Sequence, residues 1–477
     1  MRASRRGNFS QPRAGNGEFW RLSEMFHTKN YRELNRLFFM FVIPAVSSQL
    51  LSGIYTIVDG YFVGWGIGQG GLAAIGLSFP FSVIVTAIGA GIGVGGGALI
   101  AISMGRGREA LAQRILGAMV FLMIAASAVS SLLLTPLAEY LLTFYKVSPD
   151  IAEMARYYAW ILIISSPAQV VTMAMLGAVR NDGFPRKAMA IMIAAFGTNI
   201  VLDWLWVIVF PFGIAGAAWA TVASQAVSAL LLSAHFLLGM SKVRLRPRFI
   251  RLWRPLARRI AVMGVSPFGV QIATAVTMIL YNWQALAYGG DIGVAAYAVV
   301  GYIVPVGVML EEGVAEGIQP LISYYHGANL RARRRLTARL GFTAAVLVGL
   351  VCSLLLFASD RIVPAFFSMH GEAASVAARG LFLSVPVFPF LGLAKVGASY
   401  YQAVGRSDMA SVLTYGDPFI LQPLFLWTLP LFLALDGVWL AMFFTNMTLA
   451  AIFVIMWRRG SGSRRMPLTG GGLMGIL

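Results

Sequence analysis

The chain has 477 residues, of which 58% are hydrophobic and only 12% charged, and its mean hydropathy is +0.76. This composition excludes an ordinary soluble domain and predicts an integral membrane protein. The formal net charge of +18 reflects 37 Lys and Arg residues against 19 Asp and Glu. The cations are divided among alternate loops instead of gathering on one domain, so they indicate membrane topology and we expect no nucleic-acid partner.

Twelve segments are apolar and long enough to cross a bilayer, at about 20 residues per span. We expect an all-α membrane fold, because unpaired backbone groups cannot face lipid and the segments lack the alternation of barrel strands. In chain order the predicted helices are 34–62, 72–101, 113–135, 154–179, 187–210, 213–239, 258–288, 294–325, 339–357, 374–404, 408–433 and 436–457.

The two halves of the chain repeat each other at a constant spacing of 222 residues. The matching positions are Gly95 and Gly317, Leu99 and Leu321, Ile100 and Ile322, Gly105 and Gly327, Ala73 and Ala295, Ala74 and Ala296, and Gly183 and Gly405. Internal repeats with a binding site at their interface are typical of secondary transporters. We therefore predict two six-helix, pseudo-symmetric lobes around a central cavity.

These patterns predict five segments. An N-lobe over 31–241 and a C-lobe over 258–459 are joined by a basic linker at 242–257, with tails at 1–30 and 460–477. Because positively charged loops stay cytoplasmic, both termini and the linker are expected inside, and the chain is expected to be a multi-pass protein of the inner membrane. The linker is expected to touch anionic lipid head groups. Nothing in the sequence indicates oligomerisation, and we expect a monomer.

Ionisable groups inside the spans are the first functional candidates, since they are costly in lipid and usually face the bundle interior. Asp59 lies late in the first predicted helix, and Asp203 lies in the fifth. Asn199 is four residues before Asp203 and shares its helix face. Thr221 in the sixth helix follows a run of small residues that allows close helix packing. Two carboxylates close together would repel if both were ionised and empty, so the pair must hold a proton or a cation.

Several motifs resemble the multidrug and toxic compound extrusion (MATE) family. The stretch 180–225 contains RNDGFPRKAM, NIVLDW and GIAGAAWATVASQ. Pro44 with Gln49, IVDGYFVGW at 57–65 and GIQPLISYYHGA at 317–328 are also similar to that family. The resemblance extends over nearly the whole chain. It implies a twelve-helix, two-lobed antiporter that exports organic, often cationic, compounds by alternating access, and therefore not an enzyme.

The bacterial branch that the chain resembles has a cation site in the N-lobe. Its aspartate of helix 1, Asn and Asp of helix 5 and Thr of helix 6 match Asp59, Asn199, Asp203 and Thr221. The resemblance implies coupling to protons or sodium and no cofactor. It also links Pro44 to bending of helix 1, where proline's missing N–H and its ring weaken the helix.

Six residues are candidates for contact with a small organic cargo. They are Glu311, Glu312, Glu316, Tyr55, Tyr281 and Tyr302. Glu312 and Glu316 share a helix face, with Glu311 about 100° around it. Carboxylates would attract a cationic compound, and the tyrosines would add cation–π contact. Alternatively, one glutamate pairs with Lys395.

Departures from the family limit the comparison. Another branch carries acidic residues in helices 7 and 10, where this chain has Gln271, Asn282 and Lys395, so we expect no coupling site in the C-lobe.

The alternative function is a flippase for a lipid-linked precursor of the same superfamily. That function would need several cations for pyrophosphate, and we expect only Lys395 to be buried. The four histidines are scattered, so no metal site is expected beyond sodium at the coupling site.

Overall fold

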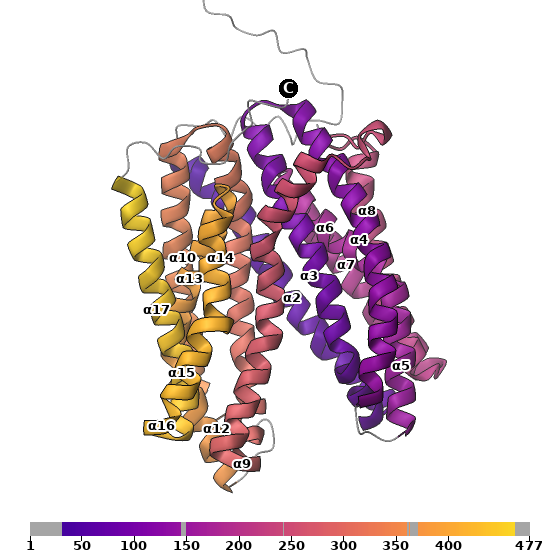
Figure 1. Cartoon of the computed structure of the whole chain (residues 1–477), viewed down its shortest axis with the longest axis vertical. Helices are drawn as coiled ribbons and strands as arrows, with labels where there is room; N and C mark the ends of the chain where they lie inside the picture. The colour runs from indigo at the N-terminus through magenta and orange to yellow at the C-terminus, as the bar shows by residue number, and fades with distance from the viewer. Residues whose placement is uncertain (1–30, 145–148, 242, 360–361, 363–370, 463–477) are drawn as a thin grey trace, which may run out of the picture. The chain divides into compact units, whose positions relative to one another are not determined.

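The computed structural model describes residues 31–144, 149–241, 243–359, 362 and 371–462. Within these ranges the chain forms helices and no strand, as predicted (Figure 1). The predicted tail at 1–30 and residues 463–477 of the other tail lie outside the described residues.

Residue contacts divide the chain into two compact units. The first extends to Phe268 and includes Glu316–Ala338 and Ala403–Gly405. The second contains Gly269–Ala315, Arg339–Gln402 and the chain from Arg406 onward. These units differ from the two halves of the sequence, because two segments of the second half, Glu316–Ala338 and Ala403–Gly405, belong to the first unit.

The first unit is built around α3, which packs against α4, α5 and α6, while α7 packs against both α2 and α8 (Figure 1). Its helices are α2 (Tyr31–Gly66), α3 (Gln69–Gly105), α4 (Glu109–Phe144), α5 (Pro149–Ile164), α6 (Ser166–Asn181), α7 (Pro185–Asp203), the π-helix η1 (Trp204–Val209), α8 (Gly213–Leu237) and the 3₁₀ turn η2 (Pro247–Phe249).

The long helix α9 (Arg254–Gly327) contributes to both units and is interrupted at Gly290, whose φ of 55° and ψ of −150° are not helical. The helices that follow are α10 (Arg331–Ser359), α12 (Gly371–Ser384), the 3₁₀ turn η3 (Val385–Val387), α13 (Phe388–Ala403), α14 (Ser407–Gly416), the π-helix η4 (Asp417–Leu421), α15 (Gln422–Thr428), α16 (Pro430–Leu433) and α17 (Leu435–Gly462).

Glycines allow the helix backbones of the first unit to touch. A Cβ on Gly93 of α3 would lie 2.7 Å from Cα of Ala174 in α6, and one on Gly177 would lie 2.7 Å from the backbone of Gly93. Gly105 and Gly327, which match in the repeat, each pack against the other's helix, so that a side chain on either would collide with backbone atoms. The small-residue stretches are therefore packing surfaces between helices.

Each of the twelve predicted spans lies on helical structure, and 294–325 is the part of α9 beyond Gly290. Within the described ranges, ten helices are individually long and apolar enough to cross a membrane, or eleven if α5 and α6 count as one span. Large apolar side chains such as Leu132 and Phe432 are exposed, which suits a surface that faces lipid.

The prediction was wrong about the continuity of several spans. Segment 154–179 is broken at Ser165 into α5 and α6, which are bent by 53°. Pro167 supplies no N–H there, and the Ser165 hydroxyl donates to the carbonyl of Ile161 at 2.7 Å. Segments 187–210 and 408–433 both pass from α-helix into a π-helix, which hydropathy does not reveal.

Candidate functional site

Four predicted site residues come together in the first unit. Asp59 lies on α2, Asn199 and Asp203 lie on the last two turns of α7, and Thr221 lies on α8. The packing of α7 against both α2 and α8 brings them to one place. Asn199 and Asp203 are fully buried and Thr221 is 9% exposed, so the polar groups face the interior of the unit.

The carboxyl groups of Asp59 and Asp203 lie close enough to interact electrostatically, and the Asn199 side chain lies beside that of Asp203. Oδ1 of Asp59, both carboxyl oxygens of Asp203 and Oδ1 of Asn199 are buried, and none has a hydrogen-bond partner among the described residues. Buried oxygens without partners are costly. This arrangement can hold a proton between the carboxyl groups or offer oxygen ligands to a hard cation.

Two tyrosines complete the same site. Tyr55 stacks on Phe196 with ring centroids 4.9 Å apart and lies beside Thr221 and the two aspartates. Tyr158 of α5 is 5% exposed and also lies beside Thr221. We predicted Tyr55 only as a cargo contact and missed Tyr158, because neither the polarity nor the spacing of α5 marks that residue.

The three candidate glutamates of α9 have three different environments. Glu316 forms an ion pair with Arg180 in the first unit. In the second unit, Nζ of Lys395 donates to Oε1 of Glu312 at 2.7 Å, so the alternative in which one glutamate pairs with Lys395 is the arrangement present. Glu311 is fully buried against Gly392, and neither of its oxygens has a hydrogen-bond partner in the described part of the chain.

Arg180 is a second, partly buried cation that sequence reasoning had placed in a loop. It lies in the last turn of α6 with its side chain 12% exposed. The next residue, Asn181, donates from Nδ2 to Oε1 of Gln319 at 2.9 Å. The motifs around 180–186 and 317–328 therefore contact each other within the first unit.

Of the two remaining candidate tyrosines, Tyr281 offers no open aromatic face. Tyr281 is 4% exposed, and its ring is stacked on Tyr297 with centroids 5.7 Å apart. We correct its predicted role, because a ring packed in this way contributes to the core and offers no free face to a cation. Tyr302 lies in α9, but its side chain is not among those described.

Pro44 lies inside α2, which continues as one helix from Tyr31 to Gly66. The Ser48 hydroxyl donates to the carbonyl of Pro44 at 2.7 Å. A bend at Pro44 during transport stays a prediction.

A second polar network of the first unit links the loop after α6 to the end of α8. Oδ2 of Asp182 lies 2.8 Å from Nε2 of His235, with both side chains fully buried, and Ser241 donates to Oδ1 at 2.8 Å. Lys187 Nζ lies 3.1 Å from Nδ1 of His235. An ammonium can only donate, so Nδ1 accepts and the Nε2 proton is donated to Asp182. Burial raises the pKa of Asp182, and the hydrogen bond from His235 opposes the rise.

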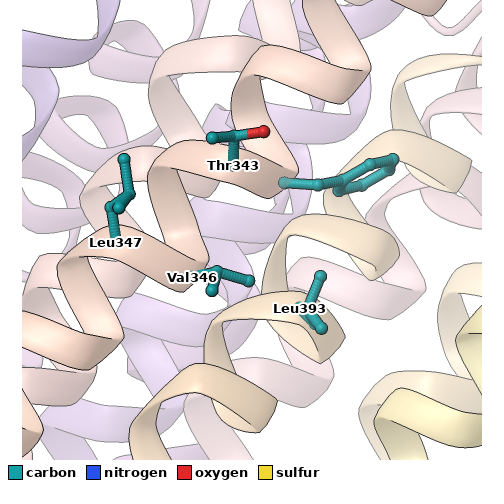
Figure 2. A pocket seen from close by; sticks show the side chains of 5 residues that line it. Thr343, Val346, Leu347 and Leu393 are labelled. Carbon is teal, nitrogen blue, oxygen red and sulfur yellow. The ribbon is translucent and has the colours of Figure 1, made fainter.

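A hollow of about 290 Å³ in the second unit is shown in Figure 2. It is lined by Phe342, Thr343, Val346 and Leu347 of α10 and by Leu393 of α13. Its lining is apolar except for one hydroxyl, so it lacks the charges that would bind an ionic compound.

In the described residues no group of three or more His, Cys, Asp or Glu side chains is placed to bind a metal.

The family model MatE matches residues 44–205 and 268–421. The chain is similar to the multidrug export protein MepA of Staphylococcus aureus strain MSSA476, with 22% identity over 383 residues that cover 80% of this chain and 84% of the relative. It has 23% identity over 398 residues to MepA of Staphylococcus saprophyticus, with the same shares covered.

Solved structures share the fold. One is the outward-facing conformation of a multidrug resistance MATE family transporter of the MOP superfamily, with a TM-score of 0.86, 21% identity, and 94% of this chain and 98% of that chain covered. Another is a MOP superfamily transporter from Pyrococcus furiosus, with a TM-score of 0.85, 22% identity and the same shares covered. The likeness confirms the predicted twelve-helix, two-lobed membrane fold.

Proposed function

Because this chain belongs to the MatE family of transporters, we propose that it exports small organic compounds, chiefly lipophilic cations, and that inward flow of protons or sodium drives the export. The relatives named multidrug export proteins support the export of small molecules. Support for ion coupling and for a cationic cargo comes from residues of this chain.

The observation that carries the coupling is the pair of the half-buried Asp59 and the fully buried Asp203. Their carboxyl groups lie close enough to interact electrostatically, and their buried oxygens have no hydrogen-bond partner among the residues described. An ion or proton that binds there changes the charge of a water-poor site. A ligand shifts the equilibrium between the inward-open and outward-open states only if it binds one state more tightly. The change of charge at Asp59 and Asp203 would supply that difference in affinity.

The cargo charge is inferred from the glutamates of α9. Glu312 is 24% exposed within a span, although it pairs with Lys395, and a carboxylate in that position attracts cations. The flippase alternative needs unpaired cations for a pyrophosphate. The two candidate cations, Lys395 and Arg180, are each paired with a glutamate, which favours cationic cargo.

The test is transport of a fluorescent organic cation in proteoliposomes under an imposed sodium or pH gradient. We expect one of the two gradients to accelerate movement of the dye against the ion flow, and its ionophore to abolish the acceleration. Dye movement at the same rate with either gradient and with none would contradict ion coupling. Stimulation by lipid pyrophosphates in place of cations would favour the flippase.

We further propose that the chain acts as a monomer in the inner membrane, with lobes at 31–241 and 258–459. Both termini and the linker at 242–257 would be cytoplasmic, and the linker would contact lipid head groups. The cations of these segments support the orientation. In the linker, the guanidinium of Arg251 lies over the ring of Trp253 at 3.9 Å.

The orientation predicts the side from which an introduced thiol reacts. The chain has a single cysteine, Cys352, which is buried, so Cys352→Ser provides a thiol-free background. In that background we expect Arg251→Cys to react with a membrane-impermeant maleimide in inside-out vesicles and not in spheroplasts. Asp150→Cys, at the exposed start of α5, should react in the opposite way. Reaction of Arg251→Cys in spheroplasts would contradict the proposed topology.

A further inference from the structure

The second unit contains a set of charges within its spans, centred on Lys395 of α13. Nζ of Lys395 donates to Oε1 of Glu312 on α9 at 2.7 Å. Asp417, the first residue of the π-helix η4, also interacts electrostatically with this ammonium. Three different helical elements therefore bring two carboxylates to one lysine.

The Lys395–Glu312 ion pair is partly exposed, although Lys395 lies within a candidate membrane span. The side chains of Lys395 and Glu312 are 25% and 24% exposed, whereas the neighbouring Glu311 is fully buried. Charged side chains within a span are too costly to face lipid, so we expect the exposed parts of this pair to meet water. Oδ1 of Asp417 is buried and has no hydrogen-bond partner among the residues described, which leaves it able to accept from a ligand.

We propose that Lys395 is a tethered counter-cation that determines the charge of the preferred cargo. Its ammonium occupies the position at Glu312 that a cationic compound would take, and the cargo binds by replacing it there. Glu312, Asp417 and Lys395 together carry one net negative charge, which a singly charged cation neutralises. This inference rests on the proposed export of organic cations, and it adds the residue that sets their charge.

The proposal makes a charge-specific prediction for Lys395→Met, which keeps much of the side-chain volume and removes the ammonium. The site would then carry two negative charges and favour a divalent cation. Ethidium and propidium share one ring system and carry one and two positive charges. We expect the ratio of the propidium Kd to the ethidium Kd to fall about tenfold, the scale of one partly screened charge interaction. The measurement is fluorescence titration of the purified full-length protein.

Two further variants distinguish charge from damage to the fold. Glu312→Gln should weaken binding of both dyes, and propidium more, because the ammonium then faces one carboxylate fewer. The double variant Glu312→Gln with Lys395→Met restores the original net charge and should bring the ratio back to within about twofold of the wild type. The matched control is Arg379→Met, which breaks the exposed Arg379–Asp436 ion pair of the same unit and should leave the ratio unchanged.

The outcomes separate this inference from the proposed function. If the wild type binds both dyes and Lys395→Met leaves the Kd ratio unchanged, the role of Lys395 is overturned while export of cations stands. An equal change of the ratio in Arg379→Met would also overturn it. If the wild type binds neither dye, the proposed cargo class is wrong, and this inference is overturned with it.

Discussion

Replacing Asp203 by Asn is expected to reduce ion-driven dye export in proteoliposomes by about 5- to 150-fold, the range of a typical coupling free energy. Asn keeps the size of the side chain but removes its negative charge. The fully buried position of Asp203 next to Asp59 then no longer changes charge when an ion or proton arrives. The same loss is expected for Asp59→Asn, and the rates are measured with and without the driving gradient.

The matched control is Asp150→Asn, which removes an exposed carboxylate of the same unit at the start of α5. This variant should keep the response of the wild type to the gradient. Dye binding in the absence of a gradient should persist in Asp203→Asn, because the glutamates proposed to attract the cargo lie on another helix, α9. Ion-driven rates close to wild type in both aspartate variants would remove the basis for the coupling site.

Replacing Asp182 by Ala is expected to destabilise the protein by about 2–6 kcal/mol, because two buried donors lose their acceptor and each costs about 1–3 kcal/mol. The change leaves the Nε2–H of His235 and the Ser241 hydroxyl without their buried acceptor. Thermal unfolding in detergent, or the yield of protein that remains monodisperse, would show the loss.

An exposed ion pair of the same unit supplies the comparison for Asp182. Glu139 and Arg156 lie 3.3 Å apart with about half of each side chain exposed. Glu139→Gln should cost less than about 1 kcal/mol, since exposed ion pairs contribute little. Equal unfolding temperatures for Asp182→Ala and the wild type would show that the buried network does not hold the loop after α6 in place.

The proposed coupling site could largely be located from the sequence, because its residues carry local signals. Asn199 and Asp203 are four apart and therefore share a helix face, and charges within apolar spans are rare enough to stand out. Tyr158 could not be found in this way. A tyrosine in an apolar helix is ordinary, and its place beside Thr221 depends on how α5 packs against α8.

The glutamates of α9 show the limit of reasoning from helical periodicity. Spacing placed Glu312 and Glu316 on one face and predicted a common role. Each instead meets a different cation, Lys395 and Arg180, and Glu311 meets none among the residues described. Periodicity gives the direction of a side chain around its own helix, whereas the partner depends on the neighbouring helix that packs there.

By itself, the sequence determined that this protein lies in a membrane, that it is helical and that its two halves repeat. Hydropathy and the need to satisfy backbone hydrogen bonds in lipid can both be read from consecutive residues of the chain. It also identified Asp59 and Asp203 as neighbours in the first unit. Only the tertiary structure decided the break at Ser165, the π-helices after Asp203 and at Asp417, and the pairing of each buried charge. The pairing of the charges depends on contacts between residues distant in sequence, because the helix that packs alongside supplies the counter-ion.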